Sequence, residues 1–264
     1  MDNNENIRFA IVATENPIHK NKYINSLVKE CSENIKLIVE LNFKHPKSNS
    51  FRHFKSYLYF LGIKGFTYSI LQKIRQLCMI LVSEILNFND GYNLKQIAKK
   101  NGIIFKKIQD VNSDKFLKLL KASNIDYILN SANQIYKQNI LEAYKNKILN
   151  RHSSLLPTYG GVHPIFWQLL NEEKMGGVTL HWIDKEIDKG TTAYQKEFKI
   201  NPGISLFGHY RIAFNISLEL SIQAINDLKQ GIVKSIPMED NYSYYTMPQK
   251  ADVKAFKQKK LKIV

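Results

Sequence analysis

The sequence has little cysteine and no long hydrophobic run. Its two cysteines, Cys31 and Cys78, lie apart in apolar helical patterns, so they make neither a disulfide framework nor a metal-ligand set. The longest uncharged apolar stretch, residues 77–83, is far shorter than the ~20 residues that a helix needs to cross a bilayer. The opening residues MDNNENIRFAIV lack the basic region of a signal peptide. We therefore expect a cytoplasmic protein with no metal site.

Several motifs that mark common active sites are also missing. The first apolar run is followed by ATENPIHK, which contains neither the G-x-G-x-x-G of dinucleotide sites nor a P-loop. The histidines that follow residue 150 do not have zinc-ligand spacing, and no G-x-S-x-G elbow is present. Nothing in the sequence therefore marks a dinucleotide, ATP, zinc or serine-hydrolase site.

What the sequence does contain is an alternation of strands and helices. With 44% apolar residues the chain can build a sizeable core. Short β-branched runs at 7–14, 35–41, 103–108, 126–131 and 148–153 read as strands, and helical patterns separate them. A hairpin-like pair at 177–183 and 192–200 and a long helix at 205–229 follow. This order predicts an α/β fold with a mostly parallel sheet flanked by helices.

Two segments stand outside this alternation. Residues 51–88 predict two helices with a turn near Gly62 and Gly65, which we expect to form an insertion packed on the sheet. The alternative is a basic amphipathic arm for a partner or a membrane. The last residues, 231–264, predict a short C-terminal appendix to a main domain at 1–230.

The net charge is strongly positive. Lys and Arg number 38 against 23 Asp and Glu, a net charge of +15, which would favour RNA, a membrane surface or a small polyanion. The alternative is a lysine-rich surface without a polyanionic partner, because the lysines are scattered along the whole chain.

A polar cluster ends the strand at 148–153. Asn150 and His152 are two residues apart, so their side chains point to the same face of the sheet. An amide beside an imidazole at the carboxyl end of a strand can stabilise an oxyanion and transfer protons. Further along the chain, TLHWIDKEIDKG places three carboxylates before a turn at Gly190, and one of them near His152 would favour the charged imidazole. Taken separately, a satisfied histidine and a solvated acidic turn are the commoner explanations of the two elements.

Together these two elements resemble the folate-dependent formyltransferase family. Its members carry N-x-H-x-S-L-L-P followed by an aromatic residue and a glycine, and later a G-V-T-x-H strand and D-x-G. The chain reads NRHSSLLPTYGG from Asn150 and GVTLH from Gly177, with Asp188 and Gly190 at the spacing of the family. The close resemblance covers 126–195 and implies a Rossmann-like formyltransferase fold.

The resemblance implies a mechanism and a donor. The donor would be 10-formyltetrahydrofolate, and no metal would be needed. Asn150 and a protonated His152 would stabilise the oxyanion formed when an amine attacks the formyl carbon, and Asp188 would orient His152 or a water. The pterin ring would lie between the loops 131–135 and 183–187, mainly against backbone groups. The donor-binding candidates are Asn133, Gln134, Ile135, Ile183, Asp184, Lys185 and Ile187.

The same resemblance bears on the acceptor amine. ATENP lacks the turn with which purine-pathway relatives hold a substrate phosphate, and the appendix is shorter than the barrel domain of relatives that formylate initiator tRNA. We therefore favour a nucleotide-linked amino sugar, with a homodimer left open. The acceptor-side candidates are Ser154, Tyr159, His163 and Trp167, and His181 and Trp182 are expected to support their strand. The alternatives are methionyl-tRNA or glycinamide ribonucleotide as acceptor, a formyltetrahydrofolate hydrolase, or an RNA- or membrane-binding protein on this scaffold.

Overall fold

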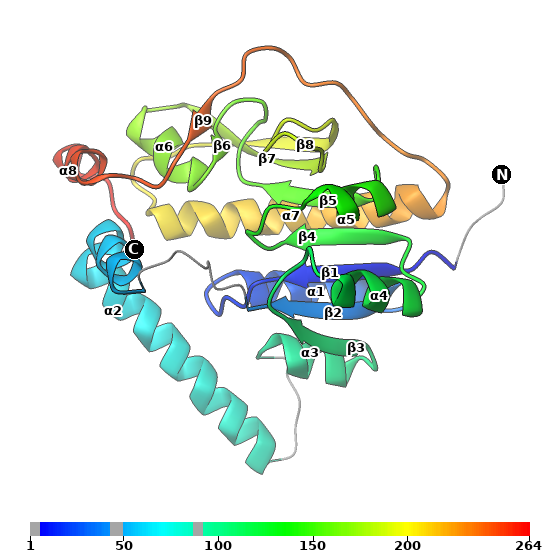
Figure 1. The fold of residues 1–264 in the computed structure, drawn as a ribbon. Helices are drawn as coiled ribbons and strands as arrows, with labels where there is room; N and C mark the ends of the chain where they lie inside the picture. Colours follow the sequence, from blue (N-terminus) through cyan, green and yellow to red (C-terminus); the bar gives the residue numbers. More distant parts are fainter. Residues whose placement is uncertain (1–5, 43–49, 87–91) are drawn as a thin grey trace.

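The protein is built on one seven-stranded sheet in the order β3-β2-β1-β4-β5-β7-β8 (Figure 1). It is represented by a computed structural model that describes residues 6–42, 50–86 and 92–264. The strands of this sheet are β1 Phe9–Ala13, β2 Ile35–Leu41, β3 Ile104–Ile108, β4 Tyr127–Ser131, β5 Ile148–His152, β7 Met175–Trp182 and β8 Thr192–Lys199. The first five strands run parallel, and β7 and β8 run antiparallel to their neighbours. The predicted α/β fold is confirmed.

Helices cover both faces of the sheet because its central strands are apolar on both sides. In β1, Phe9 and Ile11 join one core cluster, whereas Ala10 and Val12 join the other, as the alternation of side chains along a strand requires. The first cluster also contains residues of the helices α1 Lys20–Cys31, α3 Leu94–Lys100, α6 Pro164–Leu170 and α7 Leu206–Lys229. The second contains residues of α4 Asp114–Ala122 and α5 Gln138–Ala143.

The inserted helix α2, Ser50–Ile85, corrects one expectation. It is broken at Gly62, whose φ of 65° and ψ of 176° are not helical, so two helical segments form as predicted. Neither segment lies along the sheet (Figure 1). The first contacts the C-terminal helix α8, Lys250–Gln258, and adds Phe60 and Leu61 to the main core. The second touches the body along one side only, through Gln76 and Ser83. Its apolar side chains are largely exposed, for example Leu71 at 62% and Ile85 at 79%. The last two residues of the predicted insertion, 87 and 88, lie outside the described residues.

The C-terminal segment returns to the body of the protein. Strand β9, Tyr244–Tyr245, pairs with β6, Gly160–Gly161. Strand β6 is the end of the NRHSSLLPTYGG motif that begins at Asn150. Helix α8 then packs its Phe256 ring on Phe166 of α6, with ring centroids 4.6 Å apart. The predicted appendix therefore shares the main core rather than standing apart from it. Among the described residues, no helix is long and apolar enough to cross a membrane.

Candidate functional site

Asn150, His152 and Asp188 lie together at the carboxyl end of β5. Asn150 and His152 belong to β5, and Asp188 comes from the loop between β7 and β8. The Asp188 backbone is in the left-handed region at φ 54°, and its Oδ2 accepts a hydrogen bond of 2.7 Å from the Gly161 amide. The loop carrying Asp188 is thus tied to the loop that follows β5. Ligand sites of open α/β sheets lie at this edge.

The imidazole of His152 is held by a hydrogen bond on one side and faces a carboxylate on the other. Its Nε2 lies 2.8 Å from the carbonyl oxygen of Tyr159, so this nitrogen carries a proton and donates. Its Nδ1 lies 3.8 Å from Asp188 Oδ2, within ion-pair distance but longer than a hydrogen bond. An imidazolium at His152 would therefore direct its second proton toward Asp188.

His181 is a fourth member of this cluster. It was expected to support its strand only, but its Nε2 lies 3.0 Å from Asn150 Nδ2 and 3.7 Å from Asp188 Oδ1. Burial lowers the pKa of His181 to about 4, although Asp188 opposes this shift. A neutral imidazole can accept from Asn150 at Nε2, and its buried Nδ1 has no hydrogen-bond partner among the described residues. Trp182, in contrast, lies in the core as expected.

The orientation of Asn150 is fixed by a chain of amides. Its Oδ1 accepts from Asn130 Nδ2 at 2.8 Å, and Asn130 Oδ1 accepts from the hydroxyl of Tyr136 at 3.0 Å. Since Asn130 and His181 bind opposite ends of the Asn150 amide, that side chain is pre-oriented at the edge of the cleft. Pre-orientation of a donor is what an oxyanion site requires.

A cleft of about 360 Å³ opens beside these residues. Its walls include every donor-binding candidate from the sequence, namely Asn133, Gln134, Ile135, Ile183, Asp184, Lys185 and Ile187. Ile135 and Ile187 are 61% and 42% exposed, and such apolar surface suits a flat ring. Gln134 is tied to the loop before α4 by a 2.6 Å hydrogen bond from its Nε2 to Asp110. Tyr244 of β9 also lines the cleft, which the sequence did not indicate.

The acceptor-side candidates require correction. Ser154 is fully buried and donates to the carbonyl of Thr158 at 2.7 Å, so it holds the loop and is not accessible to a substrate. Tyr159 stacks on Tyr245, with ring centroids 5.1 Å apart.

His163 packs on Phe60 at 4.5 Å, and Trp167 Nε1 donates to Val162 and Thr246 carbonyls. None of the four candidates lines the cleft. They fasten α2 and the C-terminal segment to the catalytic loop.

Replacing Gly161 with alanine is expected to destabilise the site. Gly161 has φ 93°, and an added Cβ would meet the Tyr245 carbonyl oxygen at 2.1 Å. Its amide also holds Asp188. The strain of the backbone alone costs about 1–3 kcal/mol, and the clash adds to it. The midpoint temperature of thermal unfolding should fall further for Gly161→Ala than for Gly102→Ala. Gly102 also has positive φ, but it has open space around it. Equal losses would contradict the role of the Tyr245 contact.

Burial of His163 predicts a pH dependence of stability. Its pKa is lowered from 6.5 to about 4 by desolvation, so between these values the unfolded state binds more protons than the folded state. The stabilisation is therefore complete above pH 6.5 and is lost as the pH falls toward 4. Denaturant unfolding measures the free energy of unfolding between pH 4 and 7. Its slope against pH should be smaller in His163→Asn than in the wild type, by up to about 1.4 kcal/mol per pH unit. An unchanged slope would show that His163 titrates alike in both states.

Known proteins resemble the part of the chain that contains this site. Residues 90–207 match the family model described as formyl transferase. The methionyl-tRNA formyltransferase of Thermodesulfovibrio yellowstonii is 33% identical over 162 residues, which cover 61% of this chain and 53% of that protein. Over these residues the chain is similar to the formyl transferase family, as the sequence resemblance indicated. It spans about half the length of the curated relatives it matches.

Solved structures share the fold. Glycinamide ribonucleotide transformylase 1 from Symbiobacterium toebii matches with a TM-score of 0.60 and 15% identity over 88% of this chain and 95% of that one. The formyltransferase PseJ from Anoxybacillus kamchatkensis, solved with UDP-4,6-dideoxy-4-formamido-L-AltNAc and tetrahydrofolate, matches at 25% identity with a TM-score of 0.50. That match covers 58% of this chain and 80% of PseJ.

Proposed function

We propose that the protein transfers a formyl group from 10-formyltetrahydrofolate to a primary amine. The observation that carries this proposal is the convergence of Asn150, His152, Asp188 and His181 on one cleft edge, with distances of 3.0–3.8 Å between neighbouring side chains. An amide donor, two imidazoles and a carboxylate supply both charge stabilisation and proton transfer. The match of residues 90–207 to the formyl transferase model supports the same reaction.

The cleft offers a fit for the donor. Ile135 and Ile187 present apolar surface from two loops, while His181 Nδ1 is a buried polar atom without a partner among the described residues. A flat, polar-edged ring between these loops would cover the apolar side chains and leave its edge to backbone groups. The bound donor supplies the electrophilic formyl carbon.

The residues of the site then have distinct roles. As the amine nitrogen bonds to the formyl carbon, Asn150 Nδ2 donates to the oxygen that becomes negatively charged, helped by a protonated His152. Asp188, acting directly or through a water, accepts the proton that the amine loses. The bond from the formyl carbon to the folate nitrogen breaks next, and that nitrogen takes up a proton. No net oxidation or reduction takes place.

We propose a nucleotide-linked amino sugar as the acceptor. PseJ, solved in complex with a UDP-linked formamido sugar, supports this acceptor class. The methionyl-tRNA formyltransferases among the curated relatives favour the second candidate, methionyl-tRNA, and the net charge of +15 is compatible with it. A formyl-transfer assay with amino-sugar nucleotides in one arm and methionyl-tRNA in the other separates the two.

The donor is tested first, by calorimetric titration with 5-formyltetrahydrofolate, a stable stand-in. We expect saturable binding to the wild-type protein and weaker binding to Asp188→Ala. The matched control is Asp240→Ala, which removes an exposed carboxylate outside the cleft and should bind as the wild type does. Absence of binding at millimolar folate would overturn the proposed function.

A further inference from the structure

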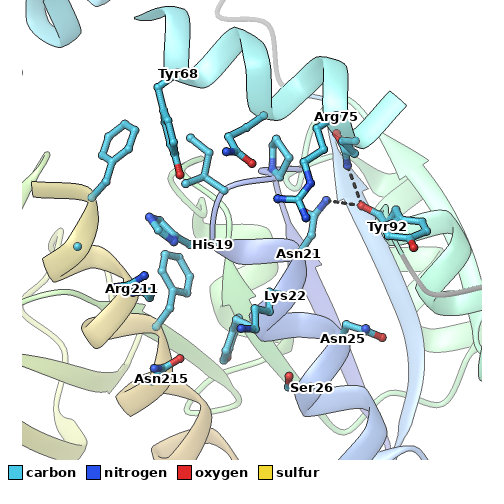
Figure 2. A pocket seen from close by; sticks show the side chains of 18 of the residues that line it. His19, Asn21, Lys22, Asn25, Ser26, Tyr68, Arg75, Tyr92, Arg211 and Asn215 are labelled. Atoms are coloured by element: carbon cyan, nitrogen blue, oxygen red, sulfur yellow. Dashed lines mark hydrogen bonds between the residues drawn. The ribbon is translucent and has the colours of Figure 1, made fainter. Parts of the chain in front are cut away.

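A second and larger cleft lies between α1, α2 and α7. Its volume is about 770 Å³, within the range of small-molecule sites. Figure 2 shows Tyr68 and Arg75 reaching in from α2, and Arg211 from α7, around His19 at the start of α1. No sequence pattern indicated it, because its walls come from segments far apart in the chain, between Pro17 and Val264.

The charged residues that line this cleft are all basic. Its lining includes Lys22, Arg75 and Arg211 but no Asp or Glu. Arg75 and Arg211 make no ion pair within the part of the chain that the structure describes. Guanidinium groups bind phosphate oxygens in bidentate geometry, so two unpaired ones across one cleft are suited to an anion that carries more than one phosphate.

Two further cations lie behind the cleft, toward the catalytic site. Lys20 Nζ donates to Thr14 Oγ1 at 2.7 Å and to the Ser131 carbonyl at 2.5 Å. Arg151 Nε donates to Ser217 at 2.7 Å, and its guanidinium covers the Phe214 ring at 3.9 Å. Neither has a carboxylate partner in the described residues, and desolvation lowers the pKa of Lys20 to about 7. Half-buried cations without a counter-charge are costly, and a nearby anion would offset that cost.

Aromatic side chains lie beside these charges. The rings of Tyr68 and Phe207 are 5.8 Å apart, and His19 stacks on Phe214 at 5.8 Å. Burial and the neighbouring arginines lower the pKa of His19 to about 4, so its ring is neutral at physiological pH. Aromatic faces next to cations suit a ligand that combines a planar base with phosphates.

The two clefts share a wall. Arg151 lines the catalytic cleft and covers Phe214, which lines the larger cleft. Lys20 is bonded to the carbonyl of Ser131, the last residue of β4, whose neighbour Asn130 orients Asn150. The two clefts therefore approach each other at Arg151, whose neighbours in β5 are Asn150 and His152.

We propose that the cleft between α1, α2 and α7 binds a nucleoside diphosphate, with Arg75 and Arg211 on the phosphates and Tyr68 and Phe207 beside the base. This inference rests on the proposed function and deepens it, because the sugar attached to such a nucleotide would extend across the shared wall toward Asn150. The recognition itself needs no catalysis and can be tested by binding alone.

The test is calorimetric titration with UDP, dTDP, uridine and inorganic pyrophosphate. We expect UDP or dTDP to bind, and the double variant Arg75→Ala/Arg211→Ala to bind at least tenfold more weakly. The control Lys115→Ala/Lys118→Ala removes the same charge from α4, on the other face of the sheet, and should bind normally.

Each other outcome has a definite meaning. Pyrophosphate binding as tightly as UDP would overturn the nucleoside part of the inference, and equal weakening in the control would show a non-specific charge effect. No nucleotide binding while 5-formyltetrahydrofolate still binds would overturn the inference and leave the proposed function intact. If the wild-type protein does not bind 5-formyltetrahydrofolate at all, the proposed function is overturned instead.

A second inference rests on a different observation, the outer face of α2. In the segment 63–86, Gln76 faces the body and donates to Glu15 at 2.7 Å, and Ser83 accepts from Gln96 at 2.9 Å. The opposite side carries apolar residues at helical spacing, each 42–79% exposed, namely Ile63, Ile70, Leu71, Ile74, Leu77, Leu81 and Ile85. We call these seven residues the outer face.

The outer face is larger than an isolated protein normally exposes. Together its side chains expose on the order of 800 Å², against about 300–600 Å² for the largest patch of a typical monomer and about 800 Å² per partner in a standard interface. It also continues a heptad pattern through Leu71, Ile74, Cys78, Leu81 and Ile85, which is typical of a helix that pairs with another helix.

The pattern is self-complementary about Ile74. An antiparallel pair of these helices with Ile74 on the two-fold axis sets Ile63 against Ile85 and Leu71 against Leu77. The same register sets Lys64 against Glu84, and both of these side chains are exposed. A two-fold interface uses the same patch on both copies, so we infer that the outer face binds a second copy of this chain.

Sedimentation equilibrium tests this inference. We expect a dimer for the wild-type protein and a monomer for Ile74→Glu, whose two carboxylates would meet on the axis. The control Ile232→Glu changes an exposed isoleucine outside α2, 43% exposed, and should remain dimeric. In a Cys78→Ser background, Ile74→Cys should form an intermolecular disulfide under mild oxidation.

Exchanging the charges of Lys64 and Glu84 tests the proposed register more specifically. Lys64→Glu should weaken the dimer, and adding Glu84→Lys to the same chain should restore it. A monomeric wild-type protein, with or without binding to anionic lipid vesicles, would overturn the inference. Equal dimerisation of wild type and Ile74→Glu would show that the copies meet elsewhere.

Discussion

Formyl transfer by Asp188→Asn is expected to be about a hundred- to ten-thousand-fold slower than by the wild-type protein, the range that general acid–base catalysis contributes. The amide keeps an oxygen that accepts from Gly161, so the loop should keep its place. What is lost is the negative charge 3.8 Å from His152 and 3.7 Å from His181. Single-turnover kinetics with the formylated donor measures the change in kcat apart from binding.

The control for this experiment is Glu219→Gln. The side chain of Glu219 is 58% exposed, pairs with Lys196 and lies outside the cleft. We expect its rate to stay within about threefold of the wild type, since an exposed ion pair contributes little. A comparable loss in both variants would show that the net charge of the protein, rather than the position of Asp188, determines the rate.

Replacing Asn150 with alanine is expected to slow the reaction by about a hundred- to a thousand-fold, as removal of one oxyanion donor does. The loss should fall on kcat and leave the dissociation constant of 5-formyltetrahydrofolate within a few-fold. The reason is that Asn150 is assigned to the oxygen of the transition state and not to the ground-state donor. Weakened donor binding with unchanged kcat would contradict this assignment.

Asn130→Ala separates orientation from chemistry. Asn130 holds the Oδ1 of Asn150 at 2.8 Å and faces the Tyr136 hydroxyl. Without it the Asn150 amide is free to rotate, so we expect a smaller loss than in Asn150→Ala. The double variant should be no slower than Asn150→Ala, because both act through one side chain. Additive losses would show that Asn130 acts independently.

The catalytic residues could be predicted because they belong to local patterns. Asn150 and His152 alternate on one strand end, and Asp188 follows at a fixed step from His181 in a short loop. The proposed donor-binding loops 131–135 and 183–187 were predicted from the family resemblance. The carboxyl ends of the parallel strands β4 and β5 meet at one edge of the sheet, which places loop 131–135 beside Asn150 and His152. Strand β7 is antiparallel to β5, so only the tertiary structure shows that 183–187 lines the same cleft.

The contact of His181 with Asn150 could not be predicted from a local sequence pattern. His181 is the cross-strand partner of Asn150 in the antiparallel pairing of β5 and β7. A sequence pattern indicates that each strand exists, but the register between two strands separated by 23 residues depends on the sheet as a whole. For the same reason, Tyr159, His163 and Trp167 looked like acceptor contacts, although they bind the C-terminal segment and α2.

The sequence by itself determined the α/β alternation, the strand ends and the polar residues on them, because these follow from local periodicity and turn chemistry. Only the tertiary structure decided that α2 turns its apolar side away from the sheet and that Arg75 and Arg211 face one cleft. Both depend on contacts between segments far apart in the chain. The free energy of such contacts comes from surfaces buried together, and no single segment carries that information.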